Sequence, residues 1–275
     1  MKQIKRLTAL LIVAAVLILM PMNAMAAAKK EYVPTKAIVY RLSSGSWQVL
    51  GEENYSYTKN GRIKSYTFKS STSPHTSTEK YAWKGNYLKA EDADHYVITY
   101  SYKNKRLKSS ARTDKSSNST KTISISWKKR KGTISSNTGV PGSIGSITVN
   151  KKNQMIKMTQ TINSHGDVST TTLKYYKNGN FKSLVHVYPG YSYTVKYHKK
   201  GYLLSMVSTN SGKVAFKYKK NKKGQITEQQ ITETTIDGDV NNFRRVYSGW
   251  KKLSRPIRNC DAFGSPVPTP YAYED

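Results

Sequence analysis

The sequence has one cysteine, few acidic residues and, beyond its first segment, no long apolar run. A single cysteine, Cys260, excludes an internal disulfide, so packing and hydrogen bonds must hold the fold. Cys260 could join two chains or stay reduced, and no histidine near it in the sequence supports a catalytic role. The chain has 46 Lys and Arg against 16 Asp and Glu, a net charge of +30. A protein with this charge repels itself and attracts polyanions.

The first 26 residues have the pattern of a secretory signal peptide. Lys2, Lys5 and Arg6 precede an apolar run over 7–20, and 24–26 reads Ala-Met-Ala, a small-x-small cleavage site. Cleavage after Ala26 removes these three cations and no acid, which leaves +27. An uncleaved membrane anchor is the alternative, although the run is short for a bilayer. We therefore expect a bacterial protein from a Gram-positive source that is secreted, either free or wall-associated, with no transmembrane segment after cleavage.

Similar turns recur along the chain at intervals of about 20 to 27 residues, which is the signature of a repeat protein. Each unit has an alternating segment that ends in an aromatic or β-branched residue, then a basic turn, then a second alternating segment. Examples are "YTKNGRI" at 57–63, "YYKNGNF" at 175–181 and "YHKKGYL" at 197–203. Period-two alternation predicts strands, and Asn-Gly predicts hairpin turns in which both residues have positive φ.

Helix signals are almost absent after residue 26, so the predicted fold class is all-β. We expect serial antiparallel β-hairpins over 37–252, forming an extended, twisted or superhelical repeat sheet. Residues 27–36 are predicted to be a flexible lead-in. Residues 253–275 contain four of the nine prolines and are predicted to be a C-terminal tail or a cap strand.

The arrangement Tyr-x-x-x-Gly-Arg-Ile at 57–63 resembles the YD repeat of Rhs and teneurin-type proteins. The resemblance extends loosely over 37–235 and implies a long β-sheet wound into a hollow shell, with too few repeats here to close one. The aspartate of that motif is replaced at the matching positions, by Thr58, Asn150, Tyr176 and His198. A second resemblance, at 175–181 and 247–252, is to choline-binding and glucan-binding wall modules.

No catalytic, cofactor or metal site is predicted. The five histidines are scattered, and no Gly-x-Ser-x-Gly motif occurs. Two acidic stretches, Glu91-Asp92-x-Asp94 and Asp237-Gly-Asp239, are weak calcium candidates because they supply too few oxygen ligands. A carboxylate pair of the kind that glycosidases use cannot be identified among so few acids.

Three functions from different classes are compatible with this sequence. The first is a non-enzymatic secreted or cell-wall-associated protein whose basic, Tyr-rich β surface binds anionic envelope polymers or glycans. The alternative is a structural or protein–protein interaction array, a spacer or inhibitor without a polymer ligand. The third is a hydrolase with an unrecognised site. Specific nucleic-acid binding is not expected of a secreted chain. The predicted ligand-binding residues are Tyr175, Tyr176, Tyr193, Tyr197 and Tyr218.

Overall fold

The computed structural model describes residues 31–137, 143–161 and 166–254. The predicted signal peptide and residues 255–275, with Cys260, lie outside these ranges. The described residues contain no helix long and apolar enough to cross a membrane. The strands are β1 (Glu31–Val33), β2 (Lys36–Ser43), β3 (Ser46–Tyr57), β4 (Ile63–Ser70), β5 (Thr76–Lys84), β6 (Tyr87–Asp92), β7 (Tyr96–Lys103), β8 (Arg106–Asp114), β9 (Thr120–Lys128), β10 (Lys131–Ser136), β11 (Ser143–Val149), β12 (Met155–Thr161), β13 (Val168–Tyr175), β14 (Phe181–Tyr188), β15 (Tyr191–Tyr197), β16 (Leu203–Ser208), β17 (Gly212–Lys220), β18 (Ile226–Thr234), β19 (Val240–Ser248) and β20 (Lys251–Leu253).

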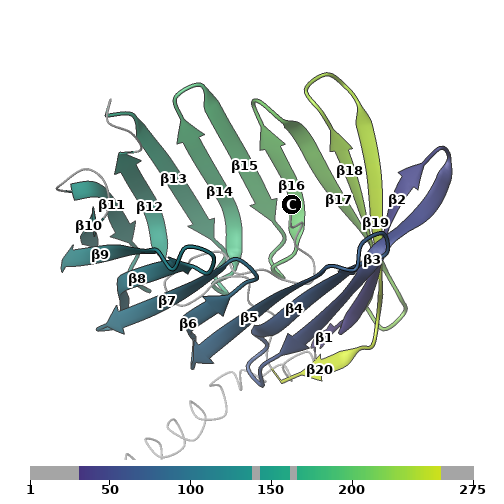
Figure 1. The fold of residues 1–275 in the computed structure, drawn as a ribbon, viewed down its shortest axis with the longest axis horizontal. Coiled ribbons are helices and arrows are strands. Elements are labelled where there is room, and N and C mark those ends of the chain that lie inside the picture. Colours follow the sequence, from purple (N-terminus) through teal and green to yellow (C-terminus); the bar gives the residue numbers. More distant parts are fainter. Residues whose placement is uncertain (1–30, 138–142, 162–165, 255–275) are drawn as a thin grey trace, which may run out of the picture.

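Strands β2 to β19 form one closed antiparallel barrel of 18 strands (Figure 1). Each strand pairs with its neighbours in the chain, and β19 closes the ring by pairing with β2, with Phe243 opposite Arg41 and Tyr247 opposite Ala37. The prediction of an extended open sheet is therefore wrong, although the serial hairpins are present. Local alternation specifies pairs of consecutive strands. Closure depends on the pairing of two strands at opposite ends of the repeat array, and a local sequence pattern carries no information about that pairing.

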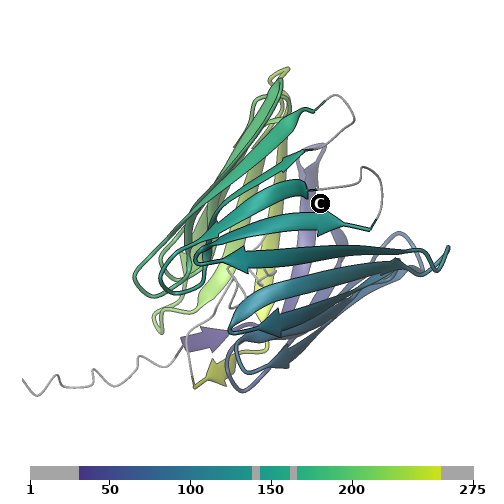
Figure 2. The same cartoon turned by 90° about the vertical axis from the view of Figure 1, so that its left-hand side faces the viewer.

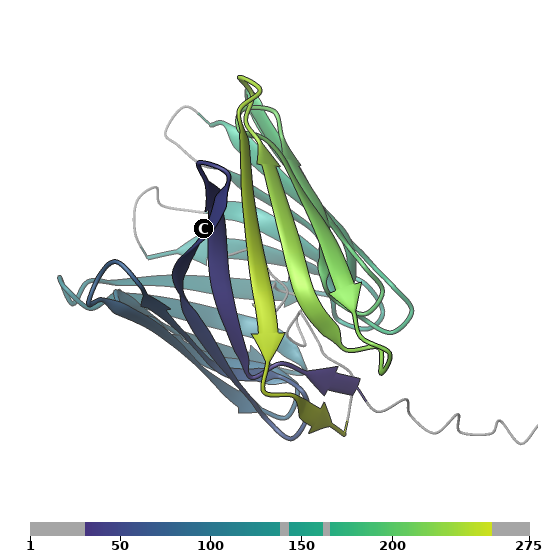
Figure 3. The same ribbon diagram turned by 90° about the vertical axis from the view of Figure 1, so that its right-hand side faces the viewer.

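The walls of the barrel are formed by the two halves of the chain. Strands β3 to β9 lie in one wall and β12 to β18 in the other, and the walls meet at β9 and β10 on one side (Figure 2). On the other side they meet at β2 and β19, which we call the seam (Figure 3).

A separate two-stranded sheet, β1 with β20, lies at one end of the barrel (Figure 3). Val33 and Leu253 from this sheet are buried in the same apolar cluster as Tyr57 and Ile226 of the barrel. The Ser254 hydroxyl also donates to the Lys59 carbonyl at 2.8 Å. The segment 27–36, predicted to be a flexible lead-in, thus contains an ordered strand that joins the two ends of the array.

Inward and outward positions alternate along every strand. In β13, Ser169, Thr171 and Leu173 are buried, whereas Lys174 on the outer side is exposed. Two apolar clusters link residues from many strands across the interior, one centred on Tyr55, Tyr81 and Tyr247 and the other on strands β8 to β18. These clusters are the hydrophobic core, and they bury the apolar half of the alternating pattern.

The recurrent aromatic–turn–aliphatic motif has a structural cause. At seven hairpins the register shifts close to the tip turn; the residue of the first strand on the turn side of the shift is aromatic or β-branched in six of them, and in β17 it is Lys220. The residues left without an opposite partner are Lys64, Lys89, Lys108, Ile156, Lys182, Leu204 and Thr227. Such β-bulges bend and twist a strand, as closure of a barrel requires.

The aromatic residue of the next hairpin hydrogen-bonds to the backbone beside the bulge. Trp83 Nε1 donates to the Ile63 carbonyl and Trp127 Nε1 to the Leu107 carbonyl, both at 2.7 Å. The hydroxyls of Tyr175 and Tyr218 do the same for the carbonyls of Met155 and Leu203, at 2.6 and 2.7 Å. The repeated aromatic therefore satisfies a carbonyl of the preceding repeat and connects adjacent hairpins.

The arginine of the "GRI" motif completes this contact. The Arg62 guanidinium lies 4.7 Å from the centre of the Trp83 ring, and Arg106 lies 5.2 Å from the Trp127 ring. Cation–π contacts of this kind are attractive by about 0.5–2 kcal/mol, depending on desolvation. The arginine before the aliphatic residue thus packs against the tryptophan of the following hairpin.

The tip turns differ in detail from the predicted Asn-Gly turn. In the five-residue turn at 58–62, Gly61 has a φ of 73°, but Asn60 is not among the residues with positive φ. The first residue of the turn is a cap: Asn150 Oδ1 accepts bonds from the backbone N–H groups of Lys152 and Gln154 at 2.8 and 3.1 Å. Asparagine here performs the local hydrogen bonding available to an aspartate.

We expect Trp127→Phe to lower the free energy of unfolding by about 1–2 kcal/mol, because it leaves a partly buried carbonyl without its donor. Trp47→Phe is the matched control, since Trp47 is 37% exposed on the outer wall. Urea denaturation of both variants measures the difference. Equal stability of the two variants would show that the indole–carbonyl bond contributes nothing.

Candidate functional site

Cations are concentrated at one end of the barrel. Eight connections lie at the end that carries the β1–β20 sheet: 58–62, 85–86, 104–105, 129–130, 150–154, 176–180, 198–202 and 221–225. We call them the basic rim. They contain no acid and twelve cations: Lys59, Arg62, Lys105, Lys129, Arg130, Lys151, Lys152, Lys177, Lys199, Lys200, Lys222 and Lys223. All of these except Arg62 are exposed.

The opposite rim has the reverse character. Its described connecting residues carry one lysine, Lys115, and four acids, Asp94, Asp167, Asp237 and Asp239. The barrel is therefore electrostatically polarised along its axis, and an anionic polymer is attracted to one end more than to the other.

The turns of the basic rim are bonded to one another. Gln154 Nε2 donates to the Gly179 carbonyl at 3.1 Å, and Asn178 Nδ2 donates to the Lys199 carbonyl at 2.7 Å. The Tyr176 hydroxyl donates to the Tyr197 carbonyl at 2.9 Å. These bonds fix the backbones of three successive turns relative to one another, and the lysines of these turns extend from that fixed backbone.

Lysine and tyrosine occupy different faces of the wall. Lys174 and Lys196 point outward from β13 and β15, whereas Val195 between Lys196 and Thr194 points into the core. Tyr175 packs on Phe181 inside the barrel, with 5.2 Å between ring centres, and Phe181 is fully buried. The predicted basic, Tyr-rich surface is thus divided, with the charge outside and most rings inside.

Four of the five predicted ligand-binding tyrosines have structural partners. Tyr175, Tyr176 and Tyr218 donate to backbone carbonyls, as described above, and Tyr197 lies 5.5 Å from the Phe181 ring. Tyr218 also accepts a bond from Gln229 Nε2 at 3.1 Å, and burial raises its pKa. The fifth, Tyr193, lies apart from these four, near His186 and Tyr191. Ligand binding by these residues stays a prediction.

The acidic stretch at 91–94 does not converge on one point. Glu91 accepts a bond from the Tyr96 hydroxyl at 2.7 Å, Asp92 pairs with Lys115 at 2.7 Å, and Asp94 accepts from the Thr78 N–H at 3.0 Å. Among the described residues no group of three or more His, Cys, Asp or Glu side chains could hold a metal ion.

Glu91 belongs to a small inward-facing polar cluster on β5 to β8. Burial raises the pKa of its carboxyl, the Tyr96 bond opposes this, and the nearby Glu79 charge raises it further. The Tyr81 hydroxyl bonds to Glu79, and the Arg112 guanidinium lies 4.3 Å from the Tyr96 ring centre. Two carboxylates on adjacent strands are what a hydrolase would need, but here each is bonded to a structural tyrosine.

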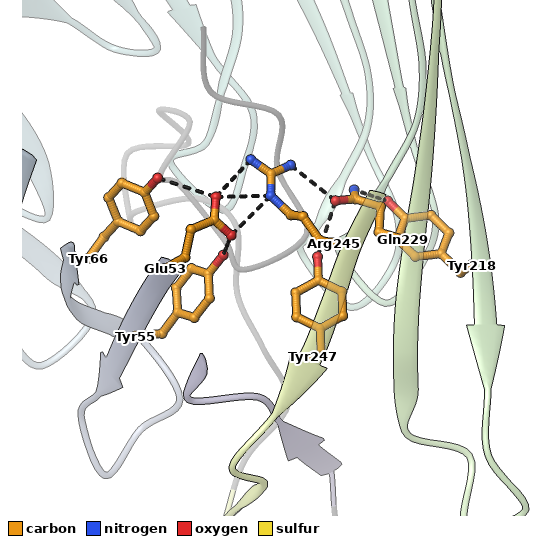
Figure 4. Close-up of polar contacts among 7 residues, drawn as sticks. All are labelled: Glu53, Tyr55, Tyr66, Tyr218, Gln229, Arg245 and Tyr247. Atoms are coloured by element: carbon orange, nitrogen blue, oxygen red, sulfur yellow. Dashed lines mark hydrogen bonds and ion pairs between the residues drawn. The ribbon is translucent and has the colours of Figure 1, made fainter. Parts of the chain in front are cut away.

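A buried ion pair spans the seam (Figure 4). Arg245 on β19 meets Glu53 on β3, with Nη2 to Oε1 at 2.9 Å and Nε 3.0 Å from both carboxylate oxygens. The intervening strand β2 presents Ala37 and Val39 at this level, opposite Glu53 and Arg245 respectively. Small side chains on β2 leave the two long ones free to meet across it.

The remaining polar atoms of the pair are also bonded. The hydroxyls of Tyr55 and Tyr66 reach Glu53 at 2.5 and 3.4 Å, and Gln229 accepts from Arg245 Nη1 and from the Tyr247 hydroxyl, each at 3.1 Å (Figure 4). Burial is the largest single effect and lowers the pKa of Arg245, but the charge of Glu53 and the hydroxyls of Tyr55, Tyr247 and Tyr66 together outweigh it and raise that pKa. Burial and the Glu53 charge together raise the pKa of Tyr55. The network is a structural clamp, because its members are buried and mutually satisfied.

Sequence reasoning did not single out Glu53 or Arg245. The available signal was weak: an acid and an arginine at inward positions of alternating strands, where the pattern otherwise places apolar residues. Such a pair can be proposed only if the closing partner strands are known.

Comparisons with known proteins do not establish a family. A scan against protein-family models finds no match, and a search of curated proteins finds none. A porin-like protein from Bacteroides uniformis is similar over 78% of this chain and 97% of its own, at 12% identity and a TM-score of 0.45.

Two crystal structures of TcdB2-TccC3 are similar over 74% and 82% of this chain. One is with TEV, at 11% identity and a TM-score of 0.31, and the other is with Cdc42, at 10% and 0.32. The chain spans 14% and 17% of the length of those two chains.

We expect Glu53→Gln and Arg245→Met each to lower the free energy of unfolding by about 3–5 kcal/mol, since each leaves one buried charge uncompensated. The double variant should recover part of this loss, and a double-mutant cycle by urea denaturation measures the coupling. Glu228→Gln is the control, because its pair with the exposed Lys219 lies on the outer wall and should contribute below about 1 kcal/mol. Additive single effects would contradict a direct pair.

Stability should also depend on Glu91 and pH. A carboxyl whose pKa is raised in the folded state stabilises the protein when protonated, and this contribution is lost as pH rises from the ordinary value of 4.5 through the raised value. Glu91→Gln should therefore flatten the fall in melting temperature over that range relative to wild type. Glu52→Gln, on the outer wall, should leave the profile unchanged. Parallel profiles for wild type and Glu91→Gln would contradict the assignment.

Proposed function

We propose that this is a non-enzymatic, secreted or cell-wall-associated protein that holds anionic envelope polymers at its basic rim. The observation that carries the proposal is the set of twelve cations, without an acid, in eight connections at one end of the barrel. Wall teichoic acids and acidic polysaccharides present repeated phosphates or carboxylates, which such a ring of lysines attracts without a unique pocket. Lysine suits this role as a mobile point charge.

The outer wall supports an aqueous location for the folded barrel. Many outward positions carry hydroxyl and ammonium groups, as in Thr122, Ser124 and Ser126 of β9 and Lys213 and Lys217 of β17, and the exposed apolar residues between them, such as Val187, are scattered. Hydroxyl pairs bridge neighbouring strands there, such as Ser146 with Thr159 at 2.8 Å. A lipid-facing wall would need an outward apolar band. The outward lysines add a uniform positive field that strengthens attraction to the rim.

Binding to purified Gram-positive cell walls, with and without teichoic acid, tests the proposal by co-sedimentation across a salt series. We expect binding that falls steeply with salt and is lost with the teichoic acid, since screening weakens exposed charge pairs. Lys199→Gln, Lys200→Gln, Lys222→Gln and Lys223→Gln together neutralise two adjacent tips and should weaken binding about tenfold at 0.15 M salt.

The matched control removes the same charge from the strands. Lys69→Gln, Lys80→Gln, Lys174→Gln and Lys196→Gln all change exposed outward positions of the strands. We expect this variant to bind within about threefold of wild type. Equal losses in the two variants would show that charge is used over the whole wall and would contradict a rim site.

A protein–protein interaction function is the second candidate, favoured by an apolar area on the outer wall at the seam. Among the described residues, Ile38, Trp47, Val49 and Val240 are exposed on the strands at and next to the seam, and Ile236 is exposed in the turn between β18 and β19. The Arg244 guanidinium lies between Tyr40 and Trp47, 4.5 and 4.7 Å from their ring centres. Salt-insensitive binding to one protein, lost with Trp47→Ala, would favour this function over polymer binding.

A further inference from the structure

The inner face of β14 and β15 carries a group of aromatic side chains near the opposite rim. The register places Thr171, His186, Tyr193 and Ser208 in one row across β13 to β16. Tyr188 and Tyr191 are opposite each other in the same two strands, next to the hairpin turn. We call His186, Tyr188, Tyr191 and Tyr193 the inner aromatic patch.

Contacts fix the geometry of the patch. The His186 and Tyr193 rings are stacked, with 5.1 Å between centres and 29° between planes, and Tyr191 lies 5.8 Å from Tyr193. His186 Nδ1 is 2.9 Å from the Thr171 hydroxyl, which orients the imidazole and leaves Nε2 pointing away from that bond. The patch is therefore a packed platform of rings.

The hydroxyls of the three patch tyrosines differ from those of most inward-facing tyrosines of the repeat. Bonded hydroxyls are found at Tyr55, Tyr57, Tyr66, Tyr81, Tyr96, Tyr175, Tyr176, Tyr218 and Tyr247. Within the part of the chain that the structure describes, Tyr188, Tyr191 and Tyr193 have none. All three side chains are half-buried. Tyr193 also packs against the hydrophobic core, but these half-buried rings leave their hydroxyls available to a ligand.

Solvent reaches the inner face at this end. Inward-facing side chains near the opposite rim are exposed, among them Arg41, Arg112 and Lys121, whereas inward residues near the basic rim, such as Phe181 and Leu173, are buried. The patch itself contains no lysine, arginine, aspartate or glutamate. Burial and the neighbouring Tyr191 raise the pKa of Tyr193, which keeps its hydroxyl a neutral donor.

We propose that the inner aromatic patch binds an uncharged β-linked glycan by stacking hexopyranose rings on Tyr193 and Tyr191. A hexopyranose with equatorial substituents presents C–H groups on its ring faces and hydroxyls around its edge. Aromatic rings bury the faces, and nearby polar tips bind the edge. His186 Nε2 and the three tyrosine hydroxyls supply these polar tips. An anionic ligand does not fit, because no cation belongs to the patch.

This site is separate from the basic rim in position and in chemistry. It includes Tyr193, one of the five tyrosines predicted from the sequence, and adds His186, Tyr188 and Tyr191. Neutral glycan binding should persist in high salt, where binding of a polymer to the rim is screened. The two proposals can therefore fail independently.

Isothermal titration calorimetry of the mature chain in 0.5 M NaCl tests the site with three neutral probes. These are hexa-N-acetylchitohexaose, cellohexaose and maltohexaose. We expect saturable binding of at least one β-linked probe and weaker binding of the α-linked maltohexaose, whose rings do not lie in an extended row. Tyr193→Ala and Tyr191→Ala should each weaken binding about tenfold, as expected when one aromatic contact dominates.

Two further variants make the test specific. Tyr193→Phe keeps the ring and loses one hydroxyl that binds the sugar edge, so it should weaken binding about threefold, which is less than the loss in Tyr193→Ala. Tyr40→Ala, on the outer wall, should bind as wild type. Circular dichroism identifies any variant that fails to fold, and if one alanine variant does not fold, the other alanine variant decides the test. Absence of saturable binding to all three probes would overturn the proposal. Wild-type affinity of folded Tyr191→Ala and Tyr193→Ala would also overturn it.

Discussion

The Glu53–Arg245 pair is the interaction on which the closed barrel most depends. It lies across β2, so it ties β3 to β19 and holds the first and last strands of the array together. A repeat array of hairpins has free edges wherever it stops, and closure removes them. A buried ion pair is often no more stable than an apolar pair of similar size. Its geometry is directional, however, and the best-attested role of such pairs is to select one arrangement of elements over the alternatives. Here it adds a directional contact across the seam, where the backbones of β2 and β19 also pair.

The bulges and the aromatic donors serve the same closure from within each repeat. A flat meander would not curve enough to return on itself, and seven bulges at one rim add the required twist. Each bulge disturbs the backbone ladder, and residues such as Trp83 and Trp127 satisfy the carbonyls next to it. The same short motif therefore supplies both the bulge that curves the sheet and the side chain that bonds to the carbonyl beside the bulge.

Sequence reasoning recovers those features that are local. Alternation and turn composition predicted the strands and tip turns, because hairpins pair residues close in the chain. Closure was missed, because the pairing of Arg41 with Phe243 leaves no local trace. The joint basic and tyrosine-rich surface was also an interpretation of composition. In the structure most of these lysines and tyrosines lie on opposite faces of the sheet. Lys174 and Tyr175, for example, are adjacent in sequence, and adjacent residues of a strand point to opposite sides. Tyr188 and Tyr191 could not be distinguished from structural tyrosines, because the distinction is whether the hydroxyl already has a partner.

The axial polarity of the barrel places the two proposed binding surfaces at opposite ends. At the basic rim, apolar side chains fill the interior and the β1–β20 sheet packs against them. The exposed parts of this rim are therefore the turns, whose charged side chains are all lysine or arginine. At the opposite rim the interior residues are polar and partly exposed, and the turns are short of cations. Sites there depend on stacking and hydrogen bonds. A polymer that carries both phosphate and neutral sugar would meet the two ends by different forces, one screened by salt and the other not. The same chain could then hold a charged strand at one rim while it recognises a sugar chain at the other.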